Sequence, residues 1–318
     1  MKWTFYIYCH FLTINTALSW EWFDSVMDSI TGERCINRWM PNDVKGLKND
    51  FNKEVFGQPF LERALIPLLK HHLGVDMPED YVPRKALALS FHGSPGVGKT
   101  YVSQLIARHL FKDGEKSKFY KMISLGKSME MTETHLRELV ISTVWECDRA
   151  VFVFDEIEKM ADGTFEILKS FLDFHKSVDK VDYRKSIFIF ISNIGEDRIN
   201  SLALSYWKKG INREDYPLLE FSKVLEAAIY NENSGLKKTK IVKNYLIDLY
   251  LPFLPLEKRH VEKCIAVEAH MSKVHLTPNS VKTIIDSIEF LPAEEQIYSP
   301  KGCKNLASLV KIHGRNEL

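Results

Sequence analysis

The sequence predicts an α/β fold with a mostly parallel central sheet, followed by a smaller helical domain. Three observations support this prediction. Short apolar stretches of strand length alternate with stretches of helical periodicity, a glycine-rich motif stands between one such strand and the next helix, and the chain after residue 256 has mainly helical patterns. Apolar strands that alternate with helices are typical of parallel sheets covered on both faces. A chain of 318 residues is long enough for one large domain and a small one.

The composition excludes several classes of protein. Hydrophobic residues make up 45% of the chain and charged residues 27%, which are ordinary globular values that argue against disorder and against a protein with several membrane spans. The 43 Lys and Arg residues balance 42 Asp and Glu residues, so the formal net charge is +1. Such a balance gives no electrostatic reason to expect nucleic acid as a partner.

The two ends of the chain carry patterns of protein targeting. Lys2 precedes an almost uncharged, largely apolar run, and small residues follow it at 17–19. This pattern predicts a signal peptide over residues 1–19, with a buried first helix as the alternative. Residues 315–318 read Arg-Asn-Glu-Leu, a conservative variant of the K-D-E-L retrieval signal. Together the two patterns predict a protein of the endoplasmic reticulum lumen, which includes the perinuclear space.

The first expected elements lie before the glycine-rich motif. Residues 20–42 are rich in aromatic side chains and are expected to pack on the core, with docking on a membrane surface as the alternative. A helix is expected over residues 43–56, capped by Asn42 or Asp43. Residues 58–72 have leucines at helical spacing, which predicts a second helix.

From residue 86 onward, strands and helices alternate. Short apolar runs predict the strands, and apolar residues at three- and four-residue spacing predict the helices. The expected elements, in order, are a strand at 86–92, a helix at 100–111, a helix at 135–145, a strand at 151–154, a helix at 163–174 and a strand at 187–192. We expect a large domain over residues 43–256 and a small helical domain over residues 257–318.

The glycine-rich motif predicts a phosphate-binding loop. Residues 93–100 match G-x-x-x-x-G-K-[ST], with an expected strand before them and a helix after them. Glycines let successive backbone N–H groups surround a phosphate, and the helix N-terminus adds its positive end. Lys99 is expected to reach the β- and γ-phosphates, and Thr100 to bind Mg²⁺. The motif consists of Gly93, Ser94, Pro95, Gly96, Val97, Gly98, Lys99 and Thr100.

Two further strands end in polar residues. Asp155 and Glu156 follow the strand at 151–154, and Asn193 follows the strand at 187–192. Ligands bind at the carboxyl edge of open α/β sheets, so these side chains are expected near the phosphates. Asp155 suits Mg²⁺, Glu156 suits polarisation of the attacking water, and Asn193 suits positioning of water or the γ-phosphate. For Asn193 a purely turn-forming role stays open.

These motifs resemble those of AAA+ ATPases of the Clp/HSP100 type, and within them the chain is similar to torsins. The resemblance covers roughly residues 43–312 and implies a P-loop AAA+ large domain and a helical lid that bind ATP and Mg²⁺. Phe56 and Gly57 resemble the box that lines the adenine pocket, and Lys304 resembles the sensor 2 residue that contacts the γ-phosphate. The other matching stretches are Walker B at 154–159, sensor 1 at 191–193, and torsin-like residues at 212–215, 231–235, 252–257 and 302–304.

One departure concerns the arginine finger of Clp ATPases, which reaches a neighbour's γ-phosphate. Alignment of Asp248 and residues 255–256 with the Clp stretch places Leu246 at the finger position. Loss of an arginine finger costs roughly 10³–10⁵ in rate, so the isolated chain is expected to be nearly inactive. The resemblance implies a partner that supplies the arginine in trans, the lumenal domain of a type II membrane protein such as lamina-associated polypeptide 1 or its endoplasmic-reticulum-wide relative. Arg198 and Arg213 are rival fingers within the chain.

Two other departures concern substrate handling and metal binding. Clp unfoldases carry an aromatic-glycine pore loop between the Walker motifs, whereas residues 128–133 contain no such sequence. Threading of a polypeptide through a ring is therefore not expected. Many torsins have Asn where this chain has Thr100, and the hydroxyl here favours ordinary Mg²⁺ binding and true hydrolysis.

Four cysteines remain once the expected signal peptide is removed. Cys35, Cys147, Cys264 and Cys303 permit two disulfides in an oxidising compartment, in three connectivities. The resemblance to torsins implies a Cys264–Cys303 pair beside sensor 2, and Cys35–Cys147 would then be the other pair. The first pair is either a redox switch that sets the position of sensor 2 or a static staple, and the second pair is expected to be structural.

The leading functional hypothesis is an ATPase whose hydrolysis waits for the activator's arginine. The resemblance implies chaperone-like remodelling of proteins or of nuclear envelope and nuclear pore assemblies, with self-association into rings or filaments. The alternative is a nucleotide-dependent scaffold, in which ATP binding drives assembly and hydrolysis is incidental. A Glu156→Gln substitution separates the two, because it should abolish the function of an ATPase and leave a scaffold working.

Overall fold

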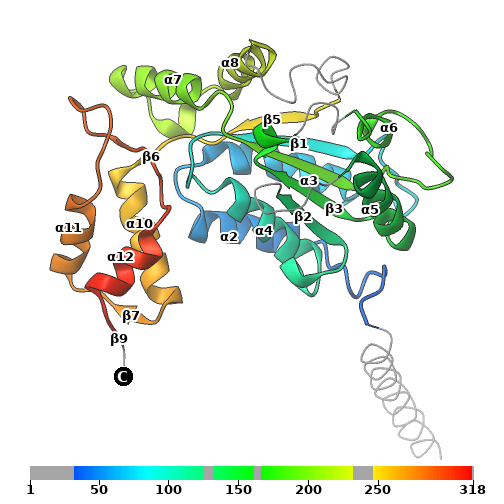
Figure 1. Ribbon diagram of the computed structural model, residues 1–318, viewed down its shortest axis with the longest axis horizontal. Coiled ribbons are helices and arrows are strands. Elements are labelled where there is room, and N and C mark those ends of the chain that lie inside the picture. The colour runs from blue at the N-terminus through cyan, green and yellow to red at the C-terminus, as the bar shows by residue number, and fades with distance from the viewer. Residues whose placement is uncertain (1–31, 125–131, 161–165, 232–245, 317–318) are drawn as a thin grey trace, which may run out of the picture.

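The computed structural model describes residues 32–124, 132–160, 166–231 and 246–316. A parallel sheet lies at the centre of the molecule, and the C-terminal helices lie together to one side of it (Figure 1). This arrangement confirms the predicted α/β fold with a helical C-terminal region. Several expectations fall outside the described residues, namely those on the signal peptide and on residues 20–31, 128–131, 163–165, 232–235 and 317–318.

Five parallel strands form the central sheet in the order β2-β3-β4-β1-β5. Every residue of β1 and β4 is buried, as expected for strands covered on both faces. The register pairs His92 with Ser192, so β1 and β4 end together and bring the phosphate loop and Asn193 to the same edge. The strand bounds are β1 Leu87–His92, β2 Tyr120–Ser124, β3 Val151–Asp155, β4 Ile187–Ser192 and β5 Leu249–Pro252.

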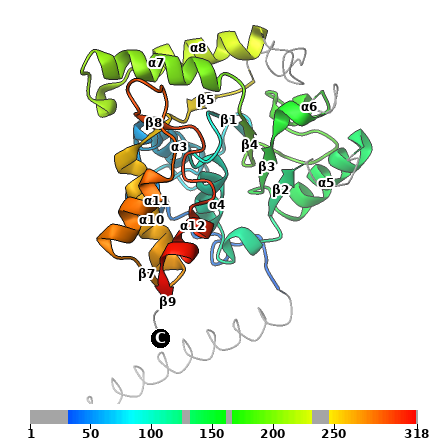
Figure 2. The same ribbon diagram turned by 60° about the vertical axis from the view of Figure 1, so that its left-hand side comes forward.

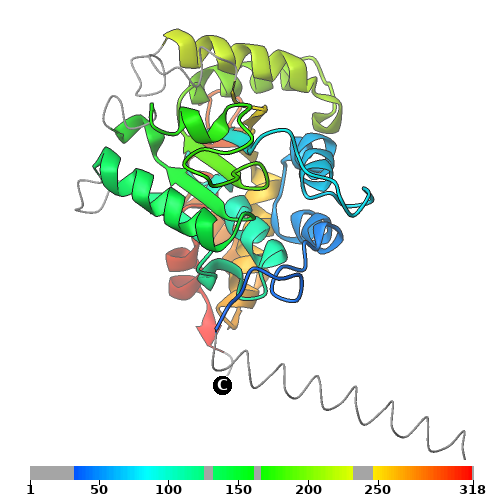
Figure 3. The same cartoon turned by 90° about the vertical axis from the view of Figure 1, so that its right-hand side faces the viewer.

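Helices cover both faces of this sheet. Helix α4 leads from β1 to β2 and α5 from β2 to β3, and these crossovers run in opposite directions along the sheet. Right-handed connections therefore put α4 and α5 on opposite faces (Figure 3). Helices α7 and α8 run side by side along one border of the molecule (Figure 2). The helix bounds are α2 Val44–Glu54, α3 Ile66–His72, α4 Lys99–Leu110, α5 Glu133–Glu146, α6 Lys169–Leu172, α7 Glu196–Lys208 and α8 Leu218–Asn231.

Helix α2 has the N-terminal cap and the buried face that its sequence predicts. Asp43 caps it by accepting a hydrogen bond from the Gly46 amide at 2.8 Å, which decides between the two caps considered. Val44, Leu47 and Phe51 are its buried residues, and their spacing puts them on one face of the helix. The amphipathic pattern thus fixes which side of α2 packs on the core.

The helix expected over residues 58–72 contains a π-helical turn. The turn η1 (Leu61–Leu65) leads directly into α3, and the Ile66 amide donates to the Leu61 carbonyl. Pro67 has no amide hydrogen, and a proline ring crowds the preceding turn of an α-helix. The wider π-helical turn accommodates both effects.

The helix expected over residues 163–174 is shorter than predicted. Among the described residues of this stretch, only those of α6 are helical. Asp173 leaves the helical conformation, and its carboxylate accepts a hydrogen bond from the Phe174 amide at 2.8 Å. Phe171 is buried whereas Phe174 is 64% exposed, so the apolar face ends one turn earlier than the sequence suggests.

The C-terminal region consists of three helices and two short strand pairs. Val261, Ile265, Ile284 and Val310, from all three helices, are fully buried between them. The bounds are α10 Lys258–Met271, α11 Pro278–Asp286 and α12 Leu306–His313, with β6 (Leu256–Glu257) paired to β8 (Tyr298–Ser299) and β7 (Val274–His275) paired to β9 (Arg315–Asn316). Within the described part of the chain, no helix combines the length and apolar character needed to span a bilayer.

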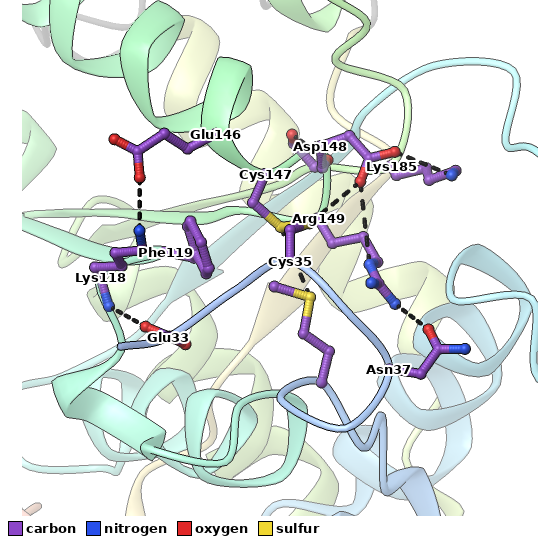
Figure 4. The surroundings of a disulfide bond; sticks show 12 residues. Glu33, Cys35, Asn37, Lys118, Phe119, Glu146, Cys147, Asp148, Arg149 and Lys185 are labelled. Atoms are coloured by element: carbon purple, nitrogen blue, oxygen red, sulfur yellow. Dashed lines mark hydrogen bonds and ion pairs between the residues drawn. A yellow bond between two sulfur atoms is a disulfide. The ribbon is translucent and has the colours of Figure 1, made fainter. Parts of the chain in front are cut away.

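The described end of the aromatic segment is fastened to the large region. A disulfide joins Cys35 to Cys147, the residue that follows α5 (Figure 4). Glu33 accepts hydrogen bonds from Ser117 Oγ at 2.5 Å and from the Lys118 amide at 2.7 Å. This part of the segment therefore packs on the core.

Candidate nucleotide-binding site

Residues 93–100 form a loop between the end of β1 and the start of α4. Gly93, Gly96 and Gly98 have φ values of 149°, 74° and 104°, in the region that favours glycine. A Cβ on Gly93 would lie 2.4 Å from the Phe253 carbonyl oxygen, so this backbone approaches its neighbour too closely for a side chain. The loop leads into the first turn of helix α4, whose N-terminal amides and dipole favour a bound anion.

Lys99 lies inside this loop with its ammonium group held by protein acceptors. Its Nζ donates to the carbonyls of Gly93 at 2.5 Å and Ser94 at 2.9 Å, and to Asn193 Oδ1 at 3.0 Å. Burial lowers the pKa of Lys99 to about 8, and nearby carboxylates, with Glu196 first among them, oppose this shift. Lys99 thus connects the phosphate loop directly to Asn193 at the end of the neighbouring strand.

Thr100 and Asp155 offer a pair of oxygen atoms suited to Mg²⁺. Thr100 Oγ1 donates a hydrogen bond to Asp155 Oδ2 at 2.9 Å. In phosphate-transfer sites Mg²⁺ takes one or two oxygen ligands from the protein and keeps waters and phosphate oxygens for the rest. The two side chains fit that donor set, and the start of α4 and the end of β3 bring together the pair that the sequence analysis assigned to the metal.

Glu156 and Asn193 lie at the same edge, and each is held by a neighbouring side chain. Glu156 has a left-handed backbone with φ 55°, and its Oε1 accepts from Lys159 Nζ at 2.7 Å. Asn193 Nδ2 donates to Glu158 Oε1 at 3.1 Å, which turns the amide oxygen toward Lys99. The sequence analysis included Glu158 in the Walker B stretch without giving it a role, because only the folded chain brings its carboxylate against Asn193.

A cavity of about 510 Å³ lies between the phosphate loop, the end of β3 and the C-terminal helices. Phe56 forms part of its wall, whereas Gly57, Gly93 and Ser94, which the sequence analysis also assigned to the nucleotide, are not among the residues that line it. Its size is within the range of small-molecule sites. The residues that line it are Glu54, Val55, Phe56, Pro95, Gly96, Val97, Gly98, Lys99, Thr100, Tyr101, Asp155, Glu156, Asn193, Leu256, Cys264, Val267, Glu268, Met271, Cys303, Lys304 and Leu306.

The phosphate loop touches the C-terminal region backbone to backbone. The Cys303 amide donates to the Gly96 carbonyl at 2.9 Å. A Cβ on Gly96 would lie 2.1 Å from the Lys301 carbonyl oxygen, and a Cβ on Gly302 would lie 2.4 Å from the Gly96 carbonyl oxygen. Two glycines that are distant in the sequence therefore allow the loop and the turn before Lys304 to meet without side chains between them.

A second disulfide lies in the wall of the cavity. It joins Cys264 of α10 to Cys303, and both residues line the cavity together with Lys304. The bond connects the helix that begins the C-terminal region to the turn that carries Lys304. Both disulfides of the described chain therefore link segments that are distant in sequence.

The residues considered as arginine fingers have three different environments. Leu246, at the finger position, is 2% exposed, and its carbonyl accepts a hydrogen bond from Lys85. Arg213 is 3% exposed and bonded inside the chain, so the hypothesis that it reaches a neighbour's phosphate is wrong. Arg198 is exposed on α7. Of the two rival arginines, only Arg198 remains as a finger within the chain.

Comparison with known families adds an independent observation. A model of the Torsin family matches residues 30–154, and a model of the Torsin-1A C-terminal domain matches residues 256–312. Together the two matches cover more than half of the 318 residues. The chain belongs to the torsin family. In this torsin the matched ranges include both the phosphate loop and the turn that packs on it.

The fold of this torsin is similar to that of Hsp104. The S. cerevisiae Hsp104–ADP complex aligns with a TM-score of 0.62 and 16% identity over 90% of this chain and 49% of the Hsp104 chain. The extended S. cerevisiae Hsp104–casein complex aligns with a TM-score of 0.58 and 15% identity over the same shares, 90% and 49%. The torsin chain spans about half the length of these Hsp104 chains, and at this identity the likeness concerns the fold alone.

Proposed function

We propose that this torsin binds MgATP in the 510 Å³ cavity and hydrolyses it when a membrane-anchored activator supplies an arginine in trans. One observation carries the proposal. The phosphate loop, the Thr100–Asp155 pair, Glu156 and Asn193 all converge on one cavity, and no arginine is among the described residues that line it. Arginine is the side chain that stabilises the transferring phosphoryl group in this class of site.

The residues of the phosphate loop would bind and hold the nucleotide. Residues 95–98 line the cavity, and the backbone N–H groups of Gly96, Val97 and Gly98 would surround the β-phosphate. Lys99 would exchange its bonds to carbonyl oxygens for bonds to β- and γ-phosphate oxygens. Thr100 and Asp155 would hold Mg²⁺, which neutralises charge on the phosphates when it is bound. Phe56 would pack beside the base.

The residues at the strand ends would act on the attacking water. Glu156 would orient and polarise this water once its ion pair with Lys159 opens. Asn193 has one amide hydrogen directed to Glu158, which leaves its second hydrogen for water or a γ-phosphate oxygen. Lys304 would place a positive charge at the γ-phosphate from the opposite wall. None of these side chains is an arginine, so the transition-state charge that a finger stabilises would still need the activator.

The cellular setting of the proposal follows from the family and the cysteines. Two disulfides fit an oxidising compartment, and we propose the endoplasmic reticulum lumen, including the perinuclear space. The activator would be the lumenal domain of a type II membrane protein like lamina-associated polypeptide 1. Self-association into rings or filaments and chaperone-like remodelling of proteins or nuclear envelope assemblies complete the proposal.

Steady-state ATP hydrolysis tests this function. The chain from residue 20 onward is assayed alone, with the activator's lumenal domain, and with that domain carrying its finger arginine changed to alanine. We expect near-zero turnover alone, a rise of roughly 10³-fold or more with the intact activator, and no rise with the alanine variant. Substantial turnover by the chain alone would contradict the proposal and make Arg198 the residue to substitute.

A nucleotide-dependent scaffold is the second candidate, and the same arginine-free cavity wall favours it. Binding without hydrolysis needs the phosphate loop but neither a finger nor a free Glu156 carboxylate. Glu156→Gln should trap an ATP- and activator-bound complex and abolish cellular function if hydrolysis matters. Unimpaired function in this variant would favour the scaffold. Glu138→Gln, on the exposed side of α5, is the matched control.

A further inference from the structure

The turn between α7 and α8 carries an arginine that lies in the interior of the molecule. Arg213, in the 3₁₀ turn η4 (Arg213–Asp215), is 3% exposed. Its Nε donates to the Gly57 carbonyl at 2.7 Å, its Nη2 to the Pro255 carbonyl at 2.8 Å, and its Nη1 to Glu257 Oε1 at 3.1 Å. One guanidinium therefore joins three segments that are far apart in the sequence.

Two of these acceptors sit at points that define the nucleotide cavity. Gly57 directly follows Phe56, which forms part of the cavity wall. Glu257 caps α10, and the same helix contributes Cys264 and Val267 to the opposite wall. The three hydrogen bonds of Arg213 described above go to residues that do not line the cavity, yet they hold the backbone next to one wall and the start of the helix that carries the other.

Gly57 also lies directly against the first turn of α10. Gly57 has φ 68°, and a Cβ on it would lie 2.8 Å from the ring of His260, in the first turn of α10. His260 Nδ1 accepts from the Glu257 amide at 3.2 Å, which completes the helix cap. Burial lowers the pKa of His260 to about 3, and the charges of Arg213 and other cations add to this shift. The ring is therefore neutral and acts as a fixed spacer between Gly57 and α10.

The chemistry of the guanidinium suits this position. Arginine presents its donors in a rigid planar fork, whereas a lysine ammonium is a single point from which three separated acceptors cannot all be reached. The charge of Arg213 is compensated by Glu257, whose second oxygen pairs with Arg259 Nε at 2.8 Å. A buried charge with its partner removed would be costly, so the cluster is stable only when its members stay together.

We propose that Arg213 is a positioning residue that couples the Phe56–Gly57 wall of the cavity to the orientation of α10. If either wall moves, Arg213 must lose a hydrogen bond to that wall, or the other wall must move with it. Occupation of the cavity thereby sets the position of the C-terminal region, and the C-terminal region sets the affinity of the cavity. The part of this inference that concerns ATP rests on the function proposed above, whereas the coupling of the two walls does not.

The chain offers a matched control for a merely structural role. Arg63 Nη1 donates to the carbonyls of Glu214 at 2.8 Å and Tyr216 at 3.0 Å, so it holds the same turn as Arg213. The contacts described for Arg63 reach neither Gly57 nor the start of α10. Arg63→Met removes support from the turn and leaves the proposed coupling intact.

The experiment compares Arg213→Met, Arg213→Lys and Arg63→Met in the full chain with wild type. Amide hydrogen exchange is measured for residues 56–58 and for α10, first without nucleotide and then with ATP, and ATP affinity is measured with a fluorescent analogue. We expect Arg213→Met to exchange about tenfold faster at both places without nucleotide and to bind ATP about tenfold more weakly. Arg213→Lys should stay folded with the charge facing Glu257 and still lose most of the affinity, while Arg63→Met should match wild type.

Two results would overturn the coupling. Equal effects of Arg63→Met and Arg213→Met would mean that Arg213 only holds the turn, and full recovery in Arg213→Lys would mean that its charge, not its fork, is what matters. The nucleotide-free exchange data decide the coupling even if wild type binds no ATP, an outcome that would count against the proposed function alone. If Arg213→Met does not fold, the Arg213→Lys data decide.

Discussion

Replacement of Gly302 by alanine is expected to push the C-terminal region away from the phosphate loop. Gly302 has φ 51°, and a Cβ on it would lie 2.4 Å from the Gly96 carbonyl oxygen. That oxygen accepts the hydrogen bond from the Cys303 amide at 2.9 Å. Because the obstacle is backbone and not a flexible side chain, the turn before Lys304 must move as a whole. ATP affinity should fall with it, since Lys304 lines the cavity.

The magnitude follows from comparison with a second glycine. Gly210 also has a left-handed backbone, with φ 70°, but a Cβ on it would have nothing within 4 Å. Both alanine variants share the left-handed penalty of roughly 1–2 kcal/mol. Only Gly302→Ala adds an overpacked contact of roughly 1–3 kcal/mol and a weakened hydrogen bond of roughly 0.5–1.5 kcal/mol. We therefore expect it to lose about 2–4 kcal/mol more stability than Gly210→Ala.

Urea unfolding followed by tryptophan fluorescence measures this difference, with both disulfides kept oxidised in all samples. Binding of a fluorescent ATP analogue to the same three proteins measures the second effect, and Gly210→Ala should bind as wild type does. Equal losses of stability in the two variants, with equal ATP affinities, would refute the reasoning. That result would mean that the loop and the turn separate without cost and that their contact does not hold the C-terminal region in place.

Three further predictions concern titration and redox state. Because burial lowers the pKa of Lys99 to about 8, ATP binding above that pH should take up a proton, and the affinity should fall by up to about tenfold per pH unit. Calorimetry in buffers of different ionisation heat detects the proton uptake, and an ATP affinity that does not change with pH would contradict this prediction. Burial lowers the pKa of His72 to about 4 and that of His92 to about 3. His260, with its pKa of about 3, adds a third such group. From pH 6.5 down to about 4 the unfolded chain binds protons at these histidines that the folded chain does not, so stability should fall by up to about 4 kcal/mol per pH unit in urea titrations, and equal stability at pH 7 and 5 would count against this. Reduction of the Cys264–Cys303 disulfide should weaken ATP binding, whereas unchanged affinity and activator binding would identify a static staple.

The strands and the phosphate loop could be predicted because their signals are local. The strands β1, β3 and β4 are continuous apolar runs, and each was located within one residue at either end. The position of Asp155 and Asn193 at one edge followed from a general property of parallel sheets, whose strands all end on the same side. Lys99 donates hydrogen bonds there to both a loop carbonyl and Asn193, because β1 and β4, which end just before these groups, are neighbours in the sheet.

Other features could not be read from short stretches of sequence. Strands β2 and β5 are sheet edges with partly exposed positions, so they lack the continuous apolar run that identifies a buried strand. Glu158 reads as one acid among several until the fold puts its carboxylate against Asn193. From the sequence Arg213 was considered only as a rival finger, because nothing near it in the sequence reveals its acceptors.

The sequence by itself determined the phosphate loop, the buried strands β1, β3 and β4 and the helices α2 and α4, since residues a few positions apart decide local backbone conformation and the burial of one face. It also determined the motifs that mark the chain as torsin-like. The tertiary structure alone decided the strand order, the contact between Gly96 and Gly302, and the burial of Arg213 against Gly57 and Glu257. These features join segments distant in the chain, and their partners are chosen by close packing and by the need to pair every buried charge and hydrogen-bonding group, which no local pattern encodes.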